Sequence, residues 1–262
     1  MARVCVLAKE GSVYANMVMT ELTDNKVDFD VIWVKKKRSK DRMSNWLLIP
    51  FNLYKSVSTG RFKALSKFNW WTWSLFFKMR NQPISDDLQE KLKRFINKRF
   101  EGYYVSSVNH VVTYKYLQAN SYDIGILAGV DIVNDFILKE FSEVCLNAHP
   151  APLPECRGGG ALENTLLQNL QPSSSVHQVT GGIDEGDIYK VKEIELDRTD
   201  NFRSLYLKLN MLGAEMLANI TKGILDGQQL DVTKNTGKLY YWKDLTLEKQ
   251  KKAHQNLKKK LL

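Results

Sequence analysis

The most informative part of this sequence is Leu146-Asn147-Ala148-His149-Pro150-Ala151-Pro152-Leu153-Pro154, continued by Arg157-Gly158-Gly159-Gly160. The apolar run at 144–146 is typical of a strand. Alternate side chains of a strand point to the same face, so Asn147 and His149 are expected to face one site. The prolines stiffen the exit, because each fixes φ at about −65°. An amide and an imidazole so placed suit chemistry in which an oxyanion develops on a carbonyl carbon.

Working outward, strand-like and helix-like segments alternate along the chain, which indicates βαβ units. Strands are expected at 3–8, 27–34, 103–105, 124–129, 174–179 and 188–196. Helices are expected at 12–22, from Ser85 onward, at 109–120, at 135–141, at 158–170 and after Asp200, with Ser12 and Asp200 as caps. We therefore expect an α/β fold with a Rossmann-like, mostly parallel sheet flanked by helices. The turn Lys9-Glu10-Gly11-Ser12 holds one glycine, which argues against a dinucleotide site.

The predicted domain boundaries are a catalytic domain at 1–228, interrupted by an insertion at roughly 35–100, and a tail at 229–262 that ends in a basic helix. The insertion is basic and rich in aromatic residues, with a run of Lys and Arg at 35–42 and aromatic segments at 46–51 and 70–78. It could pack on the sheet as a helical pair or lie on an anionic membrane surface. Base stacking on nucleic acid is less favoured.

Composition limits the class of protein and its surroundings. Lys and Arg number 38 against 29 Asp and Glu, a formal net charge of +9, which favours anionic partners or simply reflects a basic tail and solvated helix faces. The cysteines, Cys5, Cys145 and Cys156, are odd in number and lack metal-ligand spacing. We expect a cytoplasmic protein without a bound metal, a signal peptide or a spanning helix. Cys156 could be read as a nucleophile, but no partner for it is evident.

Two ordered motifs resemble a known family. The first is Asn147-x-His149-Pro150 with Leu153-Pro154 and Arg157-Gly158, and the second is His177-x-Val179 followed by Asp184-x-Gly186-x-Ile188. Together they resemble the folate-dependent formyltransferases, which include glycinamide ribonucleotide, methionyl-tRNA and sugar N-formyltransferases. The resemblance covers about 122–194. It implies N10-formyltetrahydrofolate as formyl donor, a primary amine as acceptor, and a catalytic trio of Asn147, His149 and Asp184.

The resemblance also implies roles within the site. Asn147 and a protonated His149 would stabilise the oxyanion, while Asp184 would orient His149 and keep it charged. The donor would lie against Asp131, Ile132, Val133, Thr180, Gly181, Gly182 and Ile183. Arg157, Gly158 and Gly159 could cradle a phosphate of the substrate, although glycines at a helix start also serve packing. His177 is either a supporting residue of the site or a hydrogen-bonded core residue.

The acceptor is reached by elimination. In this family the tRNA members carry a long C-terminal domain, and the purine-pathway enzymes lack an insertion at 35–100. We therefore expect an anionic nucleotide-linked amino sugar, as used in surface-polysaccharide synthesis, and no nucleic acid partner. A hydrolase that releases formate, an aminoacyl-tRNA acceptor and a non-enzymatic, membrane-associated module remain alternatives. Contact with a membrane surface and a homodimer are left open.

Overall fold

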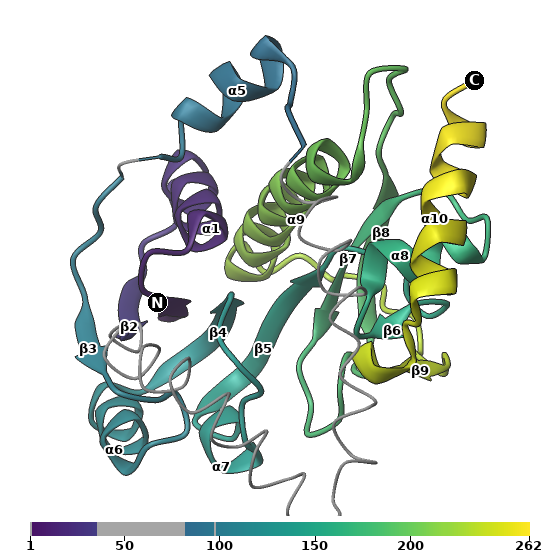
Figure 1. Ribbon diagram of the computed structural model, residues 1–262. Helices are drawn as coiled ribbons and strands as arrows, with labels where there is room; N and C mark the ends of the chain where they lie inside the picture. The colour runs from purple at the N-terminus through teal and green to yellow at the C-terminus, as the bar shows by residue number, and fades with distance from the viewer. Residues whose placement is uncertain (1, 36–81, 97) are drawn as a thin grey trace, which may run out of the picture.

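A single mixed sheet organises the chain, as the computed structural model shows for residues 2–35, 82–96 and 98–262 (Figure 1). Its strands are β1 (Val4–Lys9), β2 (Asp30–Val34), β3 (Tyr103–Val105), β4 (Tyr122–Ala128), β5 (Phe141–His149), β7 (Ser173–Gln178) and β8 (Ile188–Glu193). Their order is β3-β2-β1-β4-β5-β7-β8, with β7 antiparallel to both of its neighbours and the remaining pairs parallel. The predicted mostly parallel α/β sheet is confirmed. The basic and aromatic runs predicted within the insertion, at 36–81, lie outside the described residues.

Helices cover both faces of this sheet. They are α1 (Val13–Asp24), α5 (Asp86–Lys93), α6 (Val111–Asn120), α7 (Asp135–Leu138), α8 (Ala161–Leu167), α9 (Phe202–Leu225) and α10 (Leu247–Lys260). In Figure 1, α1 and α9 lie side by side on one face, and α6 and α7 lie on the other. The helix α10 packs against α8, so the predicted basic C-terminal helix is present and docked on the domain.

Local signals placed some boundaries correctly and others wrongly. Ser12 caps α1 as predicted, and Ser85, predicted as the start of a helix, caps α5; each accepts a hydrogen bond from a backbone N–H of the first turn. The predicted cap of α9 at Asp200 is wrong, because Asn201 forms a capping box with Ser204. The carboxylate of Asp200 instead accepts from the Ser204 hydroxyl and pairs with Lys208.

Two predicted helices are shorter than expected. The helix predicted at 158–170 begins only at Ala161, because Arg157–Gly158 form the short strand β6, which pairs in parallel with β9 (Leu239–Tyr240). The helix predicted at 135–141 ends at Leu138, and Phe141 already belongs to β5. The strand β5 is therefore nine residues long and carries Asn147 and His149 at its carboxyl end.

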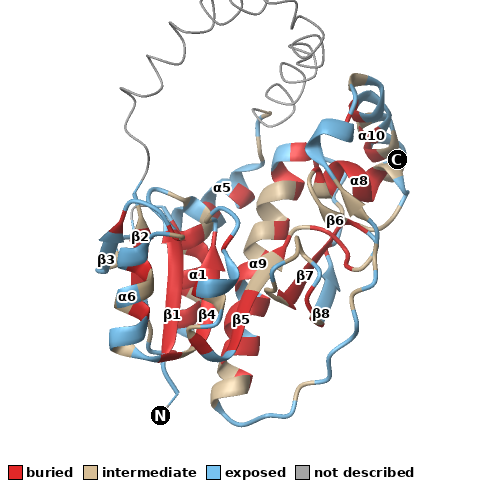
Figure 2. Cartoon of the chain, turned by 90° about the horizontal axis from the view of Figure 1, so that it is seen from below, coloured by how far each residue is buried: buried red, intermediate tan, exposed pale blue. Residues whose placement is uncertain are grey.

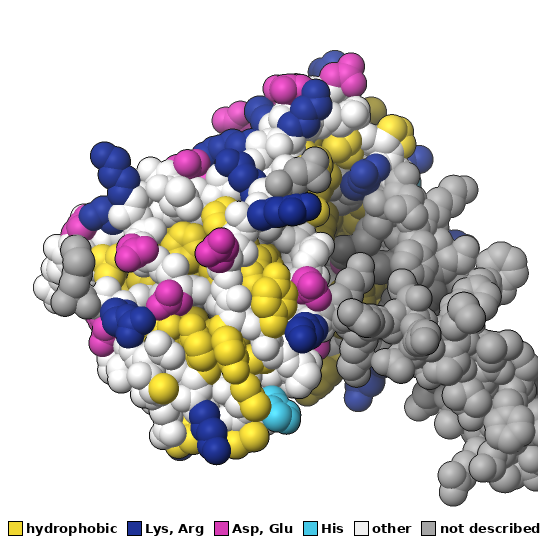
Figure 3. Space-filling model, turned by 90° about the vertical axis from the view of Figure 1, so that its left-hand side faces the viewer, with side chains coloured by type: hydrophobic (Ala, Val, Ile, Leu, Met, Phe, Trp, Pro, Cys, Tyr) yellow, Lys and Arg dark blue, Asp and Glu magenta, His cyan; other side chains and the backbone are white. Residues whose placement is uncertain are grey.

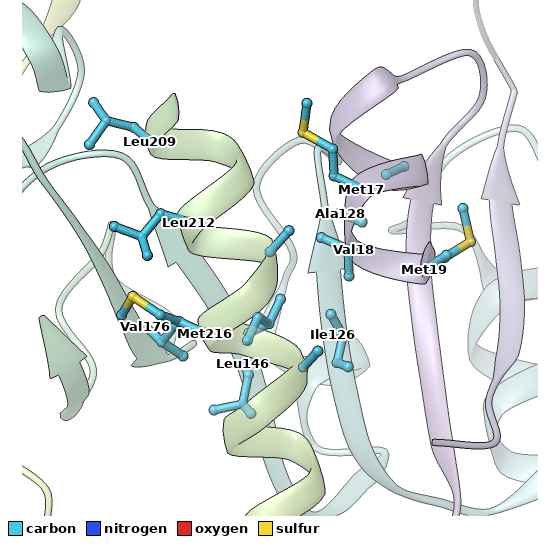
Figure 4. Packing of buried hydrophobic residues seen from close by; sticks show 14 of the residues in the cluster. Met17, Val18, Met19, Ile126, Ala128, Leu146, Val176, Leu209, Leu212 and Met216 are labelled. Atoms are coloured by element: carbon cyan, nitrogen blue, oxygen red, sulfur yellow. The ribbon is translucent and has the colours of Figure 1, made fainter. Parts of the chain in front are cut away.

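The larger hydrophobic cluster lies between the sheet and the pair α1 and α9, and a second cluster lies between the sheet and α6 and α7. Figure 4 shows Leu209, Leu212 and Met216 of α9 directed toward the strands, with Leu146 of β5 and Val176 of β7 opposite. Figure 2 shows the central strands buried and the outer helices exposed on their far sides. Burial of one helix stripe is what fixes α9 over β5 and β7, and this holds the end of β5 in place.

Replacing Leu209 by alanine is expected to lower the free energy of unfolding by about 2–5 kcal/mol, because the side chain is 0% exposed and its loss leaves a cavity. Guanidinium unfolding of both proteins measures this difference. Leu262→Ala, at a position that is 98% exposed, is the matched control and should change little. A loss below about 1 kcal/mol for Leu209→Ala would mean that α9 is not packed as described.

The sheet edge at β3 and the first turn of α6 carry exposed apolar side chains. Tyr103, Tyr104, Val111 and Val112 are all exposed, and the rings of Tyr103 and Tyr116 stack with centroids 4.3 Å apart. Figure 3 shows hydrophobic side chains grouped on this side of the molecule.

Within the described ranges, no helix combines the length and the apolar character that crossing a bilayer requires.

Candidate active site

A cavity of about 430 Å³ opens at the carboxyl ends of β1, β4 and β5. This edge is where ligands bind in open α/β sheets. One side is formed by the turn after β4 and the loop after β7, and the other by the turn after β1 and by α9. The residues that line the cavity include Ser12, Tyr14, Asp131, Ile132, Val133, Asn147, His177, Thr180, Gly182, Ile183, Asp184, Tyr206 and Asn210.

The three predicted catalytic side chains converge beside this cavity. Asp184 Oδ2 lies 3.3 Å from His149 Nδ1, and Asp184 Oδ1 lies 3.5 Å from His177 Nε2. Asn147 Nδ2 lies 3.4 Å from the same His177 nitrogen. The strand register explains the last contact, because Asn147 and His177 are paired across β5 and β7. Asn147 and Asp184 line the cavity, whereas the His149 ring lies behind Asp184 and is not part of the lining.

Both ring nitrogens of His149 face acceptors. Nε2 lies 2.8 Å from the Cys156 carbonyl, so the neutral ring carries its proton there and donates it to that oxygen. Nδ1 then presents a lone pair to the Asp184 carboxylate. One additional proton, bound between Nδ1 and Oδ2, would therefore complete a hydrogen bond between the ring and the carboxylate.

The structure does not favour the charged form of His149 that the resemblance implied. Burial lowers the pKa of His149, and the Asp184 carboxylate and the Cys156 carbonyl raise it only in part. The side chain is 7% exposed, so the loss of hydration outweighs the nearby anion. The lowered pKa favours the neutral ring at pH 7, whereas the resemblance implied a protonated His149.

Asp184 is ionised at neutral pH. Burial by itself would raise the pKa of this carboxyl, but the His177 contact and the Gly158 N–H hold it well below its usual value. The Gly158 N–H donates to Oδ2 at 3.1 Å. The backbone of Asp184 has φ = 44°, in the left-handed region that non-glycine residues rarely adopt.

Most of the predicted donor-binding residues line the cavity. Asp131, Ile132 and Val133 form one wall, and Thr180, Gly182 and Ile183 belong to the loop opposite. Gly181 does not face the cavity, because a Cβ at this position would press against the Asp135 carboxylate of α7. An apolar wall beside backbone groups fits a flat heteroaromatic ring such as a pterin.

The residues predicted to bind a substrate phosphate make contacts within the protein instead. The Arg157 guanidinium donates to the carbonyls of Ile183 at 3.0 Å and Gly237 at 3.0 Å, and it pairs with the Glu185 carboxylate at 3.1 Å. Gly158 and Gly159 have no room for a side chain, because Tyr240 and Trp242 pack directly on them. These three residues join two loops of the site, and none of them lines the cavity.

Sequence reasoning missed four lining residues: Ser12, Tyr14, Tyr206 and Asn210. They lie at or near helices that were assigned to packing. The Tyr14 hydroxyl is buried without a hydrogen-bond partner, and burial raises its pKa. The spacing of Tyr206 and Asn210, four residues apart on α9, was the available signal, because it puts both on one helix face.

Cys156 is not an available nucleophile in this arrangement. Its side chain is buried, and burial raises its pKa to about 11, so the thiol stays protonated at neutral pH. Cys5 and Cys145 are also free and buried, as expected for small core residues. Among the residues that the structure describes, no group of three or more His, Cys, Asp and Glu side chains could hold a metal ion.

Comparison with known sequences gives a family and several partial relatives. A family described as formyl transferase matches residues 85–221, just over half of the chain. The methionyl-tRNA formyltransferase of Wolbachia pipientis is 31% identical over 107 residues, which are 39% of this chain and 35% of that protein. The corresponding protein of Bacillus velezensis is 28% identical over 108 residues, or 41% and 34%. The matched region thus spans about a third of the length of these curated relatives.

Solved structures share the fold over most of the chain. A sugar N-formyltransferase from a Shewanella species has a TM-score of 0.57 at 12% identity, covering 97% of this chain and 87% of that one. A 4-N formyltransferase from Francisella tularensis has a TM-score of 0.56 at 14% identity, covering 97% and 86%. A glycinamide ribonucleotide transformylase from Symbiobacterium toebii has a TM-score of 0.54 at 15% identity, covering 89% and 95%. At such low identities the likeness shows the fold alone.

Proposed function

Because the chain belongs to the formyl transferase family, we propose that it transfers a formyl group from N10-formyltetrahydrofolate to a primary amine. The family takes its formyl group from that donor. The observation that carries the proposal is the convergence of an amide, an imidazole and a carboxylate at one end of a cavity with an apolar wall.

The folate supplies the formyl carbon that the acceptor amine attacks. Asn147 would donate a hydrogen bond to the formyl oxygen as negative charge develops there, a contribution of roughly 3 kcal/mol to lowering the barrier. The contact between Asn147 Nδ2 and His177 Nε2 sets the direction of the amide. His177 Nδ1 lies 2.7 Å from the Gln178 carbonyl, and this contact holds the ring whose Nε2 lies beside both Asn147 and Asp184.

The Asp184–His149 pair would move the proton. As the new C–N bond forms, the Asp184 carboxylate takes one proton from the attacking nitrogen. That proton can be shared between Oδ2 and His149 Nδ1, which lie 3.3 Å apart. The pair returns it to N10 as the old C–N bond breaks, so that each proton lost by the amine is recovered on the departing nitrogen.

The acceptor side of the cavity favours a sugar ring. Ser12, Tyr14, Tyr206 and Asn210 offer hydroxyl and amide groups, and none of the described lining residues is a lysine or an arginine. Such a surface suits the hydroxyls of an amino sugar better than a phosphate placed next to the amine. Two solved proteins of the same fold are described as a sugar N-formyltransferase and a 4-N formyltransferase, which agrees with this choice.

A second cavity of about 860 Å³ offers room for the nucleotide part of such an acceptor. The turn after β1 contributes to both cavities, with Ser12 in the first and Gly11 in the second. The second cavity is lined by the exposed ring of Tyr104, by the cations Lys98 and Arg99, and by the carboxylates Glu10 and Glu101. The Tyr104 ring would stack on a base and the two cations would pair with a diphosphate, so we propose this cavity for the nucleotide.

Incubating the protein with N10-formyltetrahydrofolate and a panel of amines tests the proposal. Nucleotide-linked amino sugars should be formylated, with product detected by mass spectrometry. The panel includes methionyl-tRNA, because the curated relatives are methionyl-tRNA formyltransferases. Formylation of the tRNA alone would overturn the sugar acceptor, and formate release without any acceptor would indicate a hydrolase. Absence of both products would overturn the transferase proposal.

A further inference from the structure

We propose that Asn235, in the segment after α9, is a positioning residue that fixes the carboxylate of Asp184; the inference rests on the proposed function. Asn235 Nδ2 donates to the backbone carbonyl of Asp184 at 2.6 Å and lies 3.4 Å from that of Gly186. Asn235 is thus a side chain from outside the family-like region, 51 residues along the chain, that holds the backbone of a residue in the site.

The segment that carries Asn235 is fastened along its length. Thr233 and Ile188 exchange two backbone hydrogen bonds of 2.8 Å in an isolated bridge. Lys234 pairs with Asp187 at 2.7 Å, and the Gly237 carbonyl accepts from Arg157. The strand β9 then pairs with β6. The segment therefore contacts both loops that flank the cavity, the loop that contains Asp184 and the loop that follows β5.

The burial pattern shows which side chains of the segment face the protein. Asn235, Gly237 and Leu239 are partly buried, whereas Thr236 and Lys238 are exposed. This alternation is that of an extended chain lying against a surface. Among the described residues, no group forms a hydrogen bond with the buried Asn235 Oδ1 atom. The amide thus keeps the donor contact while its oxygen gains no hydrogen bond, as expected if the donor is the useful group.

The backbone of Asp184 needs such support. A non-glycine residue in the left-handed region is less stable than in ordinary conformations, and surrounding contacts must maintain it. Asn235 holds the carbonyl of Asp184, and Arg157 holds the carbonyl of Ile183 just before it. Without the first contact, the carboxylate would no longer be held 3.3 Å from His149 Nδ1.

Loss of the Asn235 contact should therefore change the titration of His149. The groups that face its ring are the Asp184 carboxylate, the His177 imidazole and the Cys156 carbonyl. Asp184 is the anion among them, so its displacement should lower the pKa of His149 further. The turnover number should fall about 10- to 100-fold, because the proton-accepting pair is misplaced, while KM for the donor changes little.

Asn235→Ala and Asn235→Leu test the inference, since both remove the donor without adding charge. Thr236→Ala, the exposed neighbour, is the matched control. NMR titration of the histidine rings measures the pKa of His149, with the exposed His110 as internal reference and the His149→Ala protein to assign the signal. This readout needs no turnover, so it tests positioning even if the transferase proposal fails. We expect a lower pKa for His149 in both variants and an unchanged value in the control.

A double-mutant cycle with Asp184→Asn separates positioning from general stability. If Asn235 acts through the Asp184 carboxylate, Asn235→Leu should cause little further loss of turnover in the Asp184→Asn background. A His149 titration identical to that of the unmodified protein in both variants would overturn the proposal. So would equal fold-losses in the two backgrounds.

Discussion

Asp184→Asn is expected to reduce kcat roughly a thousandfold, because an amide cannot take the proton that the carboxylate shares with His149. The substitution keeps the shape of the side chain, and asparagine tolerates the left-handed backbone found at this position. The Gly158 N–H can still donate to the amide oxygen. Steady-state formylation of the best acceptor, with matched melting temperatures, measures the effect on chemistry alone.

Asp28→Asn is the matched control for this change. Asp28 is exposed and does not line the cavity. Its replacement should leave kcat within about threefold of the unmodified protein, as expected for a surface position. If Asp184→Asn retained more than a tenth of the activity, the carboxylate would not be the group that accepts the proton.

His149→Ala is expected to lower kcat by about 100- to 10,000-fold, the range typical of removing a general acid–base group. The side chain is 7% exposed and contacts Cys156 and Asp184, so some loss of stability accompanies the change. Turnover is therefore compared at a temperature where both proteins are folded. His110→Ala, at an exposed histidine, should be neutral.

The same mechanism predicts how kcat of the unmodified protein depends on pH. Proton transfer requires that no proton is already bound between His149 Nδ1 and Asp184 Oδ2. Because burial lowers the pKa of His149 below its ordinary value of 6.5, kcat should rise with pH through a midpoint below 6.5 and remain flat above it. The midpoint should disappear in His149→Ala. An acid limb that persists unchanged in that variant would assign the titration to another group.

Sequence reasoning reached the convergence of Asn147, His149 and Asp184 because two local rules suffice. Strand periodicity puts the side chains of Asn147 and His149 on one face of the sheet, and a motif resemblance points to Asp184. The charge of His149 lay beyond those rules. It depends on burial and on the Cys156 carbonyl, which lies seven residues away across the proline loop.

Arg157 illustrates a different limit. Next to three glycines, an arginine at a predicted helix start suggests a phosphate site. In the structure its guanidinium is occupied by carbonyls 26 and 80 residues away in the sequence. Contacts at that separation leave no local pattern, so neither the fate of Arg157 nor the role of Asn235 could be read from the chain. The cap of α9 was missed by one residue, because Asp200 and Asn201 are both good capping types.

The pairing of β6 with β9 has a consequence for synthesis of the protein. Residues up to Leu225 can emerge from the ribosome and bury the stripe of α9, yet Asp184 and Arg157 then still lack their partners Asn235 and Gly237. The nascent chain would hold a nearly complete sheet with an unfinished proton-handling site. The site would be complete only once residues 235–240 have also left the ribosome, after the sheet and α9 have formed.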